Sequence, residues 1–122
     1  MWVRGVRGAT CAAANSKESI IETTRQMLQR IIADNGMQPD EIASAFFSTT
    51  RDLNADFPAI AARQLGWTDV PLMCMHEMDV PGSLPMCVRV MIHWNTDKKP
   101  SQIRHVYING AERLRPDLVR EG

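Results

Sequence analysis

Side chains alternate most regularly between residues 87 and 94 of this chain. Read with a period of two, one face of the segment is entirely apolar and consists of Val88, Val90, Ile92 and Trp94. The opposite face carries Cys87, Arg89, Met91 and His93. The pattern predicts a strand over residues 88–95 with one buried face. Because a permanently charged guanidinium is costly to bury alone, we expect Arg89 to meet a carboxylate or phosphate, from the protein or from a ligand.

Other segments have the alternation of strands, and two have the periodicity of helices. The further predicted strands are residues 2–11, 42–50, 70–75 and 105–109, with a short final strand at 111–114. One helix is predicted over residues 16–35, with a serine N-cap, an apolar side and a terminating Gly36. A second helix is predicted over residues 59–65 and ends before Gly66.

This order of elements predicts an α+β fold in a single domain, with a mixed sheet that carries both main helices on one face. The other face of such a sheet needs a partner, so we expect an oligomer. In the first strand, Gly5 and Gly8 would allow another element to approach the backbone closely.

Composition and charge narrow the possible functions. The chain carries 14 basic and 14 acidic residues, and it has no lysine-rich run that would indicate nucleic-acid binding. No stretch has the ~18–20 apolar residues of a membrane span. The N-terminal segment has no pattern of a secretory signal, so we expect a cytoplasmic protein. The 3 cysteines are an odd number without a CxxC pair, which argues against a disulfide framework and a zinc ribbon.

Arginine and tyrosine side chains are the first candidates for a binding site. Arg7 and Arg89 occupy interior positions of predicted strands, and Arg63 ends the second predicted helix. Each has a structural alternative. Arg89 could pair with a carboxylate of the protein, Arg7 could be solvated, and Arg63 could be solvated or bonded to a backbone carbonyl. Tyr107 could be an aromatic residue at the edge of the core.

Residues 74–79 gather several functional groups at the end of a predicted strand. On a strand Cys74 and His76 face one way, Glu77 and Asp79 face the other, and no second cluster completes a metal site. A nucleophilic Cys74 has no group to orient a histidine base, and a buried structural thiol is the simpler alternative. If the strand ends after Cys74, however, Cys74 and Glu77 come onto one side. With a tyrosine and several arginines they would hold a small dicarboxylate that carries a hydroxyl group.

Many short segments match one known family in the same order along the chain. They are residues 1–10, 52–53, 57–59, 61–63, 70–72, 74–75, 77–80, 89–91, 102–107 and 114–118. These segments resemble the small monofunctional bacterial chorismate mutases, the trimeric class with a pseudo-α/β-barrel. The resemblance implies one chorismate-mutase-like domain over residues 1–118 and a short tail over 119–122. It also implies a homotrimer with three sites, each between adjacent subunits.

The family rearranges chorismate to prephenate without a cofactor, and the resemblance implies the same activity here. Arg89 would lie near the ether oxygen of the breaking C–O bond, and Arg7 would bind a substrate carboxylate. Glu77 and Cys74 would meet the ring hydroxyl, and Tyr107 would contact a carboxylate. The other implied pocket or rim residues are Phe57, Arg63, Leu114 and Arg115.

Two positions depart from the family's pattern. Ile60 stands where some relatives carry a charged residue, so it is assigned no polar role. Met73 precedes Cys74 where a smaller polar residue can occur, and its side chain would line either the pocket or the core.

Two other functions stay open at this point. Small trimeric imine deaminases share the fold class and also bind carboxylates with an interface arginine. A non-catalytic module that has kept a carboxylate pocket would have the same residues, because a fold does not fix a function.

Overall fold

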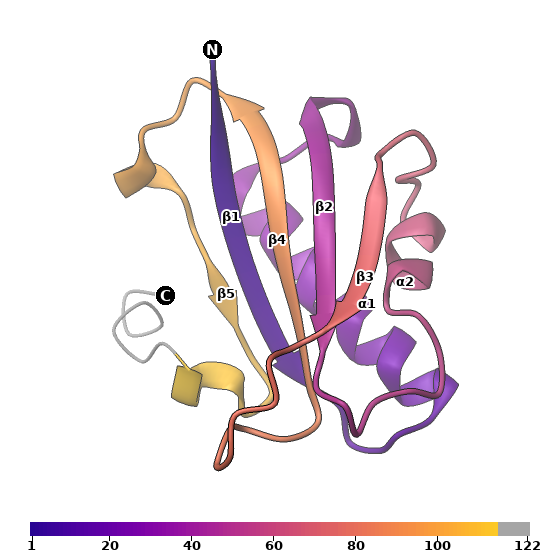
Figure 1. Ribbon diagram of the computed structural model, residues 1–122. Coiled ribbons are helices and arrows are strands. Elements are labelled where there is room, and N and C mark those ends of the chain that lie inside the picture. The colour runs from indigo at the N-terminus through magenta and orange to yellow at the C-terminus, as the bar shows by residue number, and fades with distance from the viewer. Residues whose placement is uncertain (115–122) are drawn as a thin grey trace.

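One mixed β-sheet forms the front layer of the molecule in Figure 1, and the α-helices lie behind it. The computed structural model describes residues 1–114. Within this range the sheet has five strands, which are β1 (Trp2–Cys11), β2 (Ile42–Thr49), β3 (Leu72–His76), β4 (Cys87–Thr96) and β5 (Val106–Tyr107). Their order across the sheet is β3-β2-β4-β1-β5. β4 is antiparallel to β1 and β2, whereas β5 is parallel to β1 and β3 is parallel to β2. The predicted mixed sheet of an α+β fold is confirmed.

Both predicted α-helices are present. α1 (Lys17–Asn35) begins after Ser16, whose side chain accepts a hydrogen bond from the Ser19 backbone N–H at 3.1 Å. It ends at Gly36, which adopts a left-handed conformation with φ of 69°. α2 (Ala59–Gln64) is short. Over the part of the chain that the structure describes, no helix combines the length and the apolarity needed to cross a bilayer.

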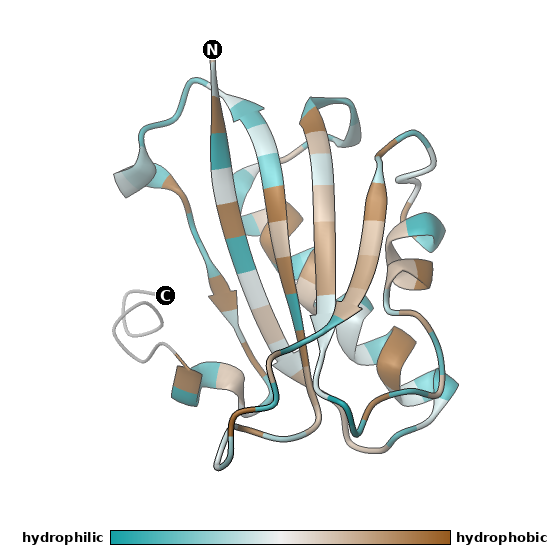
Figure 2. Ribbon diagram, in the orientation of Figure 1, coloured by the Kyte–Doolittle hydropathy of each residue, from teal (hydrophilic) through white to brown (hydrophobic). Residues whose placement is uncertain are grey.

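The core lies between the sheet and the two α-helices. The predicted apolar face of β4 is buried, and none of its four side chains is more than 4% exposed. It packs against buried side chains of both helices, namely Ile20, Met27, Leu28, Ile31, Ala61 and Ala62. Figure 2 shows hydrophobic and hydrophilic residues alternating along the strands. Because only one face of each strand enters this core, side chains on the other face are available for a site.

Gly8 allows α1 to lie close against β1. A Cβ atom at this position would lie 2.6 Å from Ile31 Cδ1 and 3.2 Å from Met27 Cγ, both on α1. The close approach expected at Gly8 is therefore confirmed. A Cβ atom at Gly5 would instead lie 3.3 Å from Sδ of Met91, on the opposite face of the sheet.

We expect Gly8→Ala to lower the free energy of unfolding by about 1–3 kcal/mol, because the new methyl group overpacks the contact between β1 and α1. Urea denaturation followed by circular dichroism measures the loss. Gly5→Ala is a matched control that should cost less, since its methyl group meets only a flexible methionine side chain. Equal losses in the two variants would contradict the packing argument.

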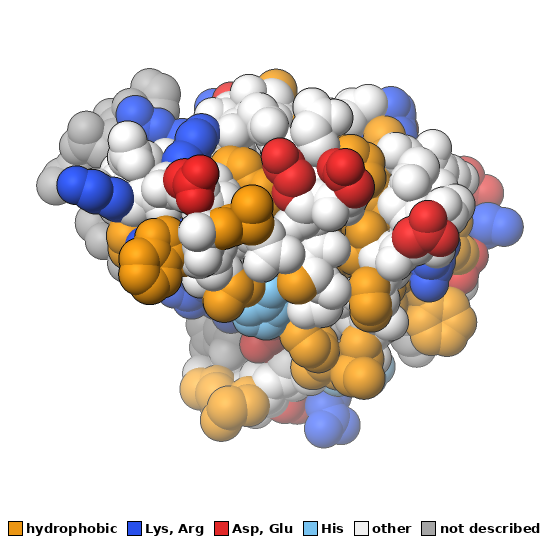
Figure 3. All heavy atoms as spheres, turned by 90° about the horizontal axis from the view of Figure 1, so that it is seen from above, with side chains coloured by type: hydrophobic (Ala, Val, Ile, Leu, Met, Phe, Trp, Pro, Cys, Tyr) orange, Lys and Arg blue, Asp and Glu red, His pale blue; other side chains and the backbone are white. Residues whose placement is uncertain are grey.

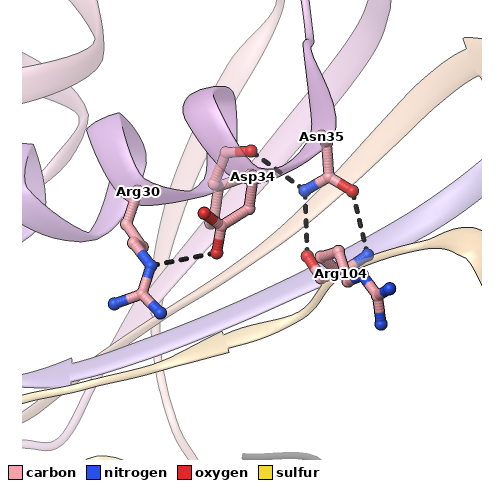
Figure 4. A network of polar contacts seen from close by, with 5 residues as sticks. Arg30, Asp34, Asn35 and Arg104 are labelled. Atoms are coloured by element: carbon pink, nitrogen blue, oxygen red, sulfur yellow. Dashed lines mark hydrogen bonds and ion pairs between the residues drawn. The ribbon is translucent and has the colours of Figure 1, made fainter. Parts of the chain in front are cut away.

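A buried amide ties the end of α1 to the segment that leads into β5 (Figure 4). Asn35 Nδ2 donates to the carbonyls of Ile31 and Arg104, each at 2.9 Å. Its Oδ1 accepts from the Arg104 backbone N–H, also at 2.9 Å. Asn35 is only 3% exposed, so these bonds replace the water that the amide loses on folding. The ion pair between Arg30 and Asp34, with 2.9 Å between Nε and Oδ2, lies beside it.

β3 begins later than predicted. The sequence predicts its start at Val70, but the strand begins at Leu72. Val70 is 4% exposed and packs into the core, and Pro71 has no N–H to donate. The Pro71 carbonyl does accept from the Ala45 N–H at 3.0 Å. Pairing with β2 therefore starts on one side of the proline and becomes regular only at Leu72.

The chain leaves the sheet earlier than predicted after β5. The expected strand at 105–109 is reduced to Val106–Tyr107, and residues 111–114 form a 3₁₀-helix where a short strand is predicted. Asn109 and Gly110 have φ values of 54° and 95°, which an extended strand does not allow. These two residues turn the chain, and the Ala111 N–H then donates to the Ile108 carbonyl at 3.0 Å.

The face of the sheet opposite the α-helices, called the open face below, carries exposed apolar side chains. Val3 is 58% exposed, Phe46 36%, Met73 57% and Met75 45%. In Figure 3, where the molecule is seen from above, hydrophobic side chains gather along the lower border of the view, on the side of this face. Exposed apolar patches of this kind mark interaction surfaces. These exposed apolar side chains support the expectation that a partner covers this face of the sheet.

Candidate functional site

A row of side chains runs across the open face. The register pairs Ser48 of β2 with Arg89 of β4, and Arg89 with Ala9 of β1. Ala9 in turn pairs with Tyr107 of β5. Because cross-strand partners point to the same side of a sheet, Arg89 lies between a hydroxyl group and the small methyl group of Ala9. Two residues predicted from the sequence, Arg89 and Tyr107, thus lie on the same face but two strands apart, and Tyr107 is only 4% exposed.

Glu77 is the carboxylate that Arg89 meets. The Glu77 backbone N–H donates to the Thr49 carbonyl at 2.8 Å, which continues the β2–β3 pairing beyond β3 and directs the side chain to the open face. Arg89 Nη1 and Glu77 Oε1 are 3.6 Å apart, and Ser48 Oγ donates a hydrogen bond to Glu77 Oε2. At 3.6 Å the ion pair lacks a good hydrogen bond, so the guanidinium keeps its donors for a ligand. The expected carboxylate partner is confirmed, and the protein itself supplies it.

Arg7, Glu77 and Arg89 line one open hollow. Its volume of about 370 Å³ lies within the range of small-molecule sites. Arg7 pairs with Met91 across the sheet, and its backbone N–H donates to His105 Nδ1 at 3.0 Å. Among the residues from 1 to 114, the Arg7 guanidinium forms no ion pair. Two guanidinium groups and one carboxylate give the hollow a net positive charge, which favours an anion.

Cys74 lies on the other side of β3, on the face that the α-helices cover. β3 stays extended through His76, which pairs with Thr49, so Cys74 and Glu77 point in opposite directions. The expectation that Cys74 and Glu77 come onto one side is therefore wrong within one chain, because pairing with β2 prevents the required turn. Cys74 and Phe57 instead line a second hollow of about 340 Å³.

The predicted residues thus divide into two groups. Arg7, Glu77 and Arg89 form the open-face group, and Phe57 and Cys74 form the edge group. The two groups lie on opposite sides of β3, which is one of the two edge strands of the sheet. One small molecule bound to a single chain would therefore touch only one of them.

The Cys74 thiol is suited to donating a hydrogen bond. Burial raises the pKa of this thiol, and a hydrogen bond with the Ala59 backbone offsets part of the rise. The protonated form therefore dominates at neutral pH, whereas a nucleophile would need the thiolate. Across residues 1–114, no group of three or more His, Cys, Asp or Glu side chains is arranged to hold a metal ion.

Residues predicted on and around α2 lie at the surface. Arg63 Nη1 donates to the carbonyls of Trp67 and Thr68 at 3.3 and 3.2 Å, so the carbonyl alternative for this arginine is observed. Phe57 is 67% exposed, which is unusual for so large an apolar side chain. Ile60 is half-buried. The rim roles of Phe57 and Arg63 stay predictions.

Two of the remaining predicted residues, Met73 and Leu114, lie on the open face or near its end. Met73 projects from the open face of β3 and does not enter the core. Leu114 is partly buried against the cluster that contains Tyr107. Arg115 lies outside the described residues.

Ser48 is a site residue that the sequence analysis did not identify. In the segment 42–50, Ser44 and Ser48 alternate with the buried Ala45 and Phe47, so the pattern does indicate that Ser48 faces away from the core. The pattern does not say which strand lies next to it. Only the sheet order, with β4 beside β2, sets Ser48 against Arg89 and Glu77.

Close relatives match nearly the whole chain. The family model for chorismate mutase type I matches residues 3–118. The chain is 47% identical over 119 residues to chorismate mutase AroH of Bacillus subtilis (strain 168), covering 97% of this chain and 94% of that protein. It is 47% identical over 117 residues to chorismate mutase AroH of Thermus thermophilus, covering 95% and 96%. The solved structure of a chorismate mutase from Clostridium thermocellum has a TM-score of 0.89 and 50% identity, and covers 93% of this chain and 99% of that one.

Proposed function

The chain belongs to the chorismate mutase type I family, and on this premise we infer that it is a chorismate mutase, an isomerase that converts chorismate to prephenate. The product leads to phenylalanine and tyrosine. The observation that carries this function is the hollow in which Arg89 lies beside Glu77 and near Arg7. Chorismate offers two carboxylates, a hydroxyl group and an ether oxygen, which suit two guanidinium groups and one carboxylate.

The reaction is an intramolecular rearrangement. One C–O bond breaks while one C–C bond forms, and no proton or electron passes to or from the enzyme. The enzyme must therefore hold a compact reactive conformer and supply positive charge where negative charge grows on the ether oxygen. Arg89 is always protonated, and it projects from a central strand of the sheet. It can supply that charge without any proton transfer.

The other open-face residues are proposed to orient the substrate. Glu77 accepts a hydrogen bond from the ring hydroxyl, while Ser48 holds the other carboxylate oxygen. Arg7 binds one substrate carboxylate. Tyr107 is proposed to contact a carboxylate from the far side of Ala9, and both residues are buried in one cluster with Cys87 and Ala111.

A homotrimer with sites between subunits is proposed to complete each site. Two arguments support it. The open face exposes Phe46, Met73 and Met75, which an adjoining subunit would cover. The edge group, Phe57 and Cys74, lies on the other side of the edge strand from the open-face group. The edge group of one subunit would close the hollow of the next, so that Cys74 and Glu77 meet one substrate from different chains.

Incubation of the purified protein with chorismate tests the function. Chromatography should show loss of chorismate and formation of prephenate at a rate far above that of the uncatalysed reaction in buffer. Tight binding of chorismate without conversion would favour the non-catalytic carboxylate-binding module. Conversion of an imino acid, with neither binding nor conversion of chorismate, would favour the imine deaminase.

We expect Ser48→Ala to lower kcat/KM for chorismate by about tenfold, because the hydroxyl that fixes the Glu77 carboxylate is lost. The loss should fall mainly on kcat if Glu77 is misaligned in the transition state. Steady-state kinetics measure it. Ser48→Thr is the matched control, since it keeps the hydroxyl group on a strand position that suits a β-branched residue. If the threonine variant loses as much as the alanine variant, Ser48 does not act through its hydrogen bond.

A further inference from the structure

Cys11 and Cys87 lie directly opposite each other on β1 and β4. The backbone N–H of Cys87 donates to Thr50 Oγ1 at 2.9 Å, and its carbonyl accepts from the Thr50 N–H at 3.0 Å, so both point away from β1. The next pair along the ladder is hydrogen-bonded, with Ala12 N–H donating to Met86 O at 2.8 Å. The cysteines therefore form a non-hydrogen-bonded pair, in which the Cα atoms of two strands approach to about 4.5 Å.

This spacing lies within the range that a disulfide spans, which is about 4.4–6.8 Å between Cα atoms. The two thiols also lie near enough for each to influence the pKa of the other. Cys87 is 2% exposed, whereas Cys11 is only partly buried. One thiol of the pair is thus open to a reagent and the other is sheltered beneath it.

We propose that Cys11 and Cys87 are a redox-active dithiol, which a low-molecular-weight disulfide oxidises to an intrachain disulfide between β1 and β4. The Cys11 thiolate attacks one sulfur of the reagent, forms a mixed disulfide and releases one reagent thiolate. Cys87 loses its proton and attacks the Cys11 sulfur, which releases the second reagent thiolate. In total two protein thiols lose two electrons and two protons, and the reagent disulfide is reduced to two thiols.

The odd cysteine count does not argue against this pair. Cys74 is the unpaired residue, and it lies on the opposite face of the sheet, on an edge strand that neither β1 nor β4 adjoins. It cannot reach either partner without separating the strands. The sequence predicts no disulfide framework, and a reversible bond between two of the three thiols is a different feature from a framework.

Reaction should be slow near neutral pH and faster in alkali. Burial raises the pKa of Cys11. The hydrogen bond with Cys87 and the charge of Arg113 oppose this rise, while the charges of Glu112 and Asp52 add to it. Because only the thiolate attacks, the rate of oxidation should increase with pH up to this raised pKa.

Burial also raises the pKa of Cys87, to about 12. The nearby Cys11 adds to the rise, Arg89 opposes it, and Glu77 contributes in the same direction as burial. Cys87 is therefore a poor first attacker. It acts as the resolving thiol, which gives the two cysteines different roles.

Oxidation of the full-length native protein with oxidised glutathione at pH 8 tests the proposal. After quenching in acid, alkylation and mass spectrometry should find a species lighter by about 2 Da that retains one free thiol. Peptide mapping should join Cys11 to Cys87. The thermal unfolding midpoint of this species should rise by about 5 °C or more, because the bond closes a long loop, and reduction should restore the original value.

Two variants, each with one cysteine replaced by serine, make the test decisive. Cys74→Ser should still form the lighter species, now with no free thiol. Cys11→Ser should not form it and should yield at most a mixed disulfide. The proposal is overturned if the native protein keeps three free thiols under conditions that oxidise the urea-unfolded chain. It is equally overturned if the bond maps to Cys74, or if the lighter species still forms in Cys11→Ser.

Discussion

Arg89→Ala should lower kcat/KM for chorismate at least about a thousandfold. Removing one neutral hydrogen-bond donor from a site of developing negative charge costs about 10²–10³ in rate, and charged donors bond roughly twice as strongly. The row across the open face consists of Ser48, Arg89, Ala9 and Tyr107. Within the described part of the chain, Arg89 supplies the only guanidinium group of this row. No neighbour in that row can therefore replace its charge. Steady-state kinetics with chorismate measure the loss.

The fold should survive this substitution. Arg89 projects from the open face of β4, and its side chain is 33% exposed. Its ion pair with Glu77 spans 3.6 Å at a partly solvated position, so the loss to stability should be within about 1 kcal/mol. Thermal unfolding and the mass in solution should match the wild type. Activity within tenfold of the wild type, in a variant that folds normally, would refute the role given to Arg89.

Arg89→Lys separates charge from geometry. Lysine keeps a positive charge but offers a compact ammonium on a flexible stem, whereas the arginine fork holds its donors in a plane. We expect the lysine variant to lie much closer to alanine than to wild type. A near-normal lysine variant would mean that charge alone suffices and that the planar geometry at this position is unimportant.

Arg89 cannot account for the whole rate increase. An acceleration of about a million-fold corresponds to roughly 8 kcal/mol of transition-state stabilisation. A hydrogen bond to a charged group contributes only ~1.5–3 kcal/mol net in most proteins, although a dry site raises this figure. The rest must come from holding chorismate in its reactive conformer. We propose that contacts of Arg7, Glu77 and Tyr107 with the substrate serve this purpose.

Local elements of this fold follow from the sequence. The alternation at 88–94 predicts β4 and its buried face, and the serine N-cap with Gly36 predicts both ends of α1. These features depend on neighbouring residues alone. The strand predicted at 111–114 is wrong. The turn before it depends on positive φ values at Asn109 and Gly110, which these residue types permit but do not require.

Relations between distant segments do not follow from periodicity. Ser48 contacts Glu77 only because β2 lies between β3 and β4 in the sheet. Strand alternation allows Cys74 and Glu77 to lie on opposite faces, but only the β2–β3 pairing, which runs through His76, excludes a turn that would bring them together. The resemblance to a family supplies their shared role without this geometry. If Cys74 and Glu77 contact one substrate, as proposed, this geometry requires that they come from different chains.

Mixed trimers test that requirement. In a ring of three identical subunits, each site would take its open-face group from one subunit and its edge group from the next. Arg89→Ala removes the cation of the first group. Phe57→Asp replaces an aromatic wall of the second group with a negative charge that repels an anionic substrate. Phe57 is 67% exposed, so this variant should still fold. Each variant alone should be nearly inactive.

Unfolding the two variants together in equal amounts and refolding them should restore activity. About three quarters of randomly assembled trimers contain both variants, and each of these has one intact site of three, so about a quarter of all sites should be of wild-type composition. Mixing Arg89→Ala with Glu77→Ala is the matched control. Both changes lie in the open-face group, so every site in those trimers lacks one of the two residues and no activity should return. Restoration in the first mixture alone means that the site is shared. A mass measurement must confirm that mixed trimers have formed. If both mixtures are then equally inactive, one chain holds the whole site and the division across β3 has no role in catalysis.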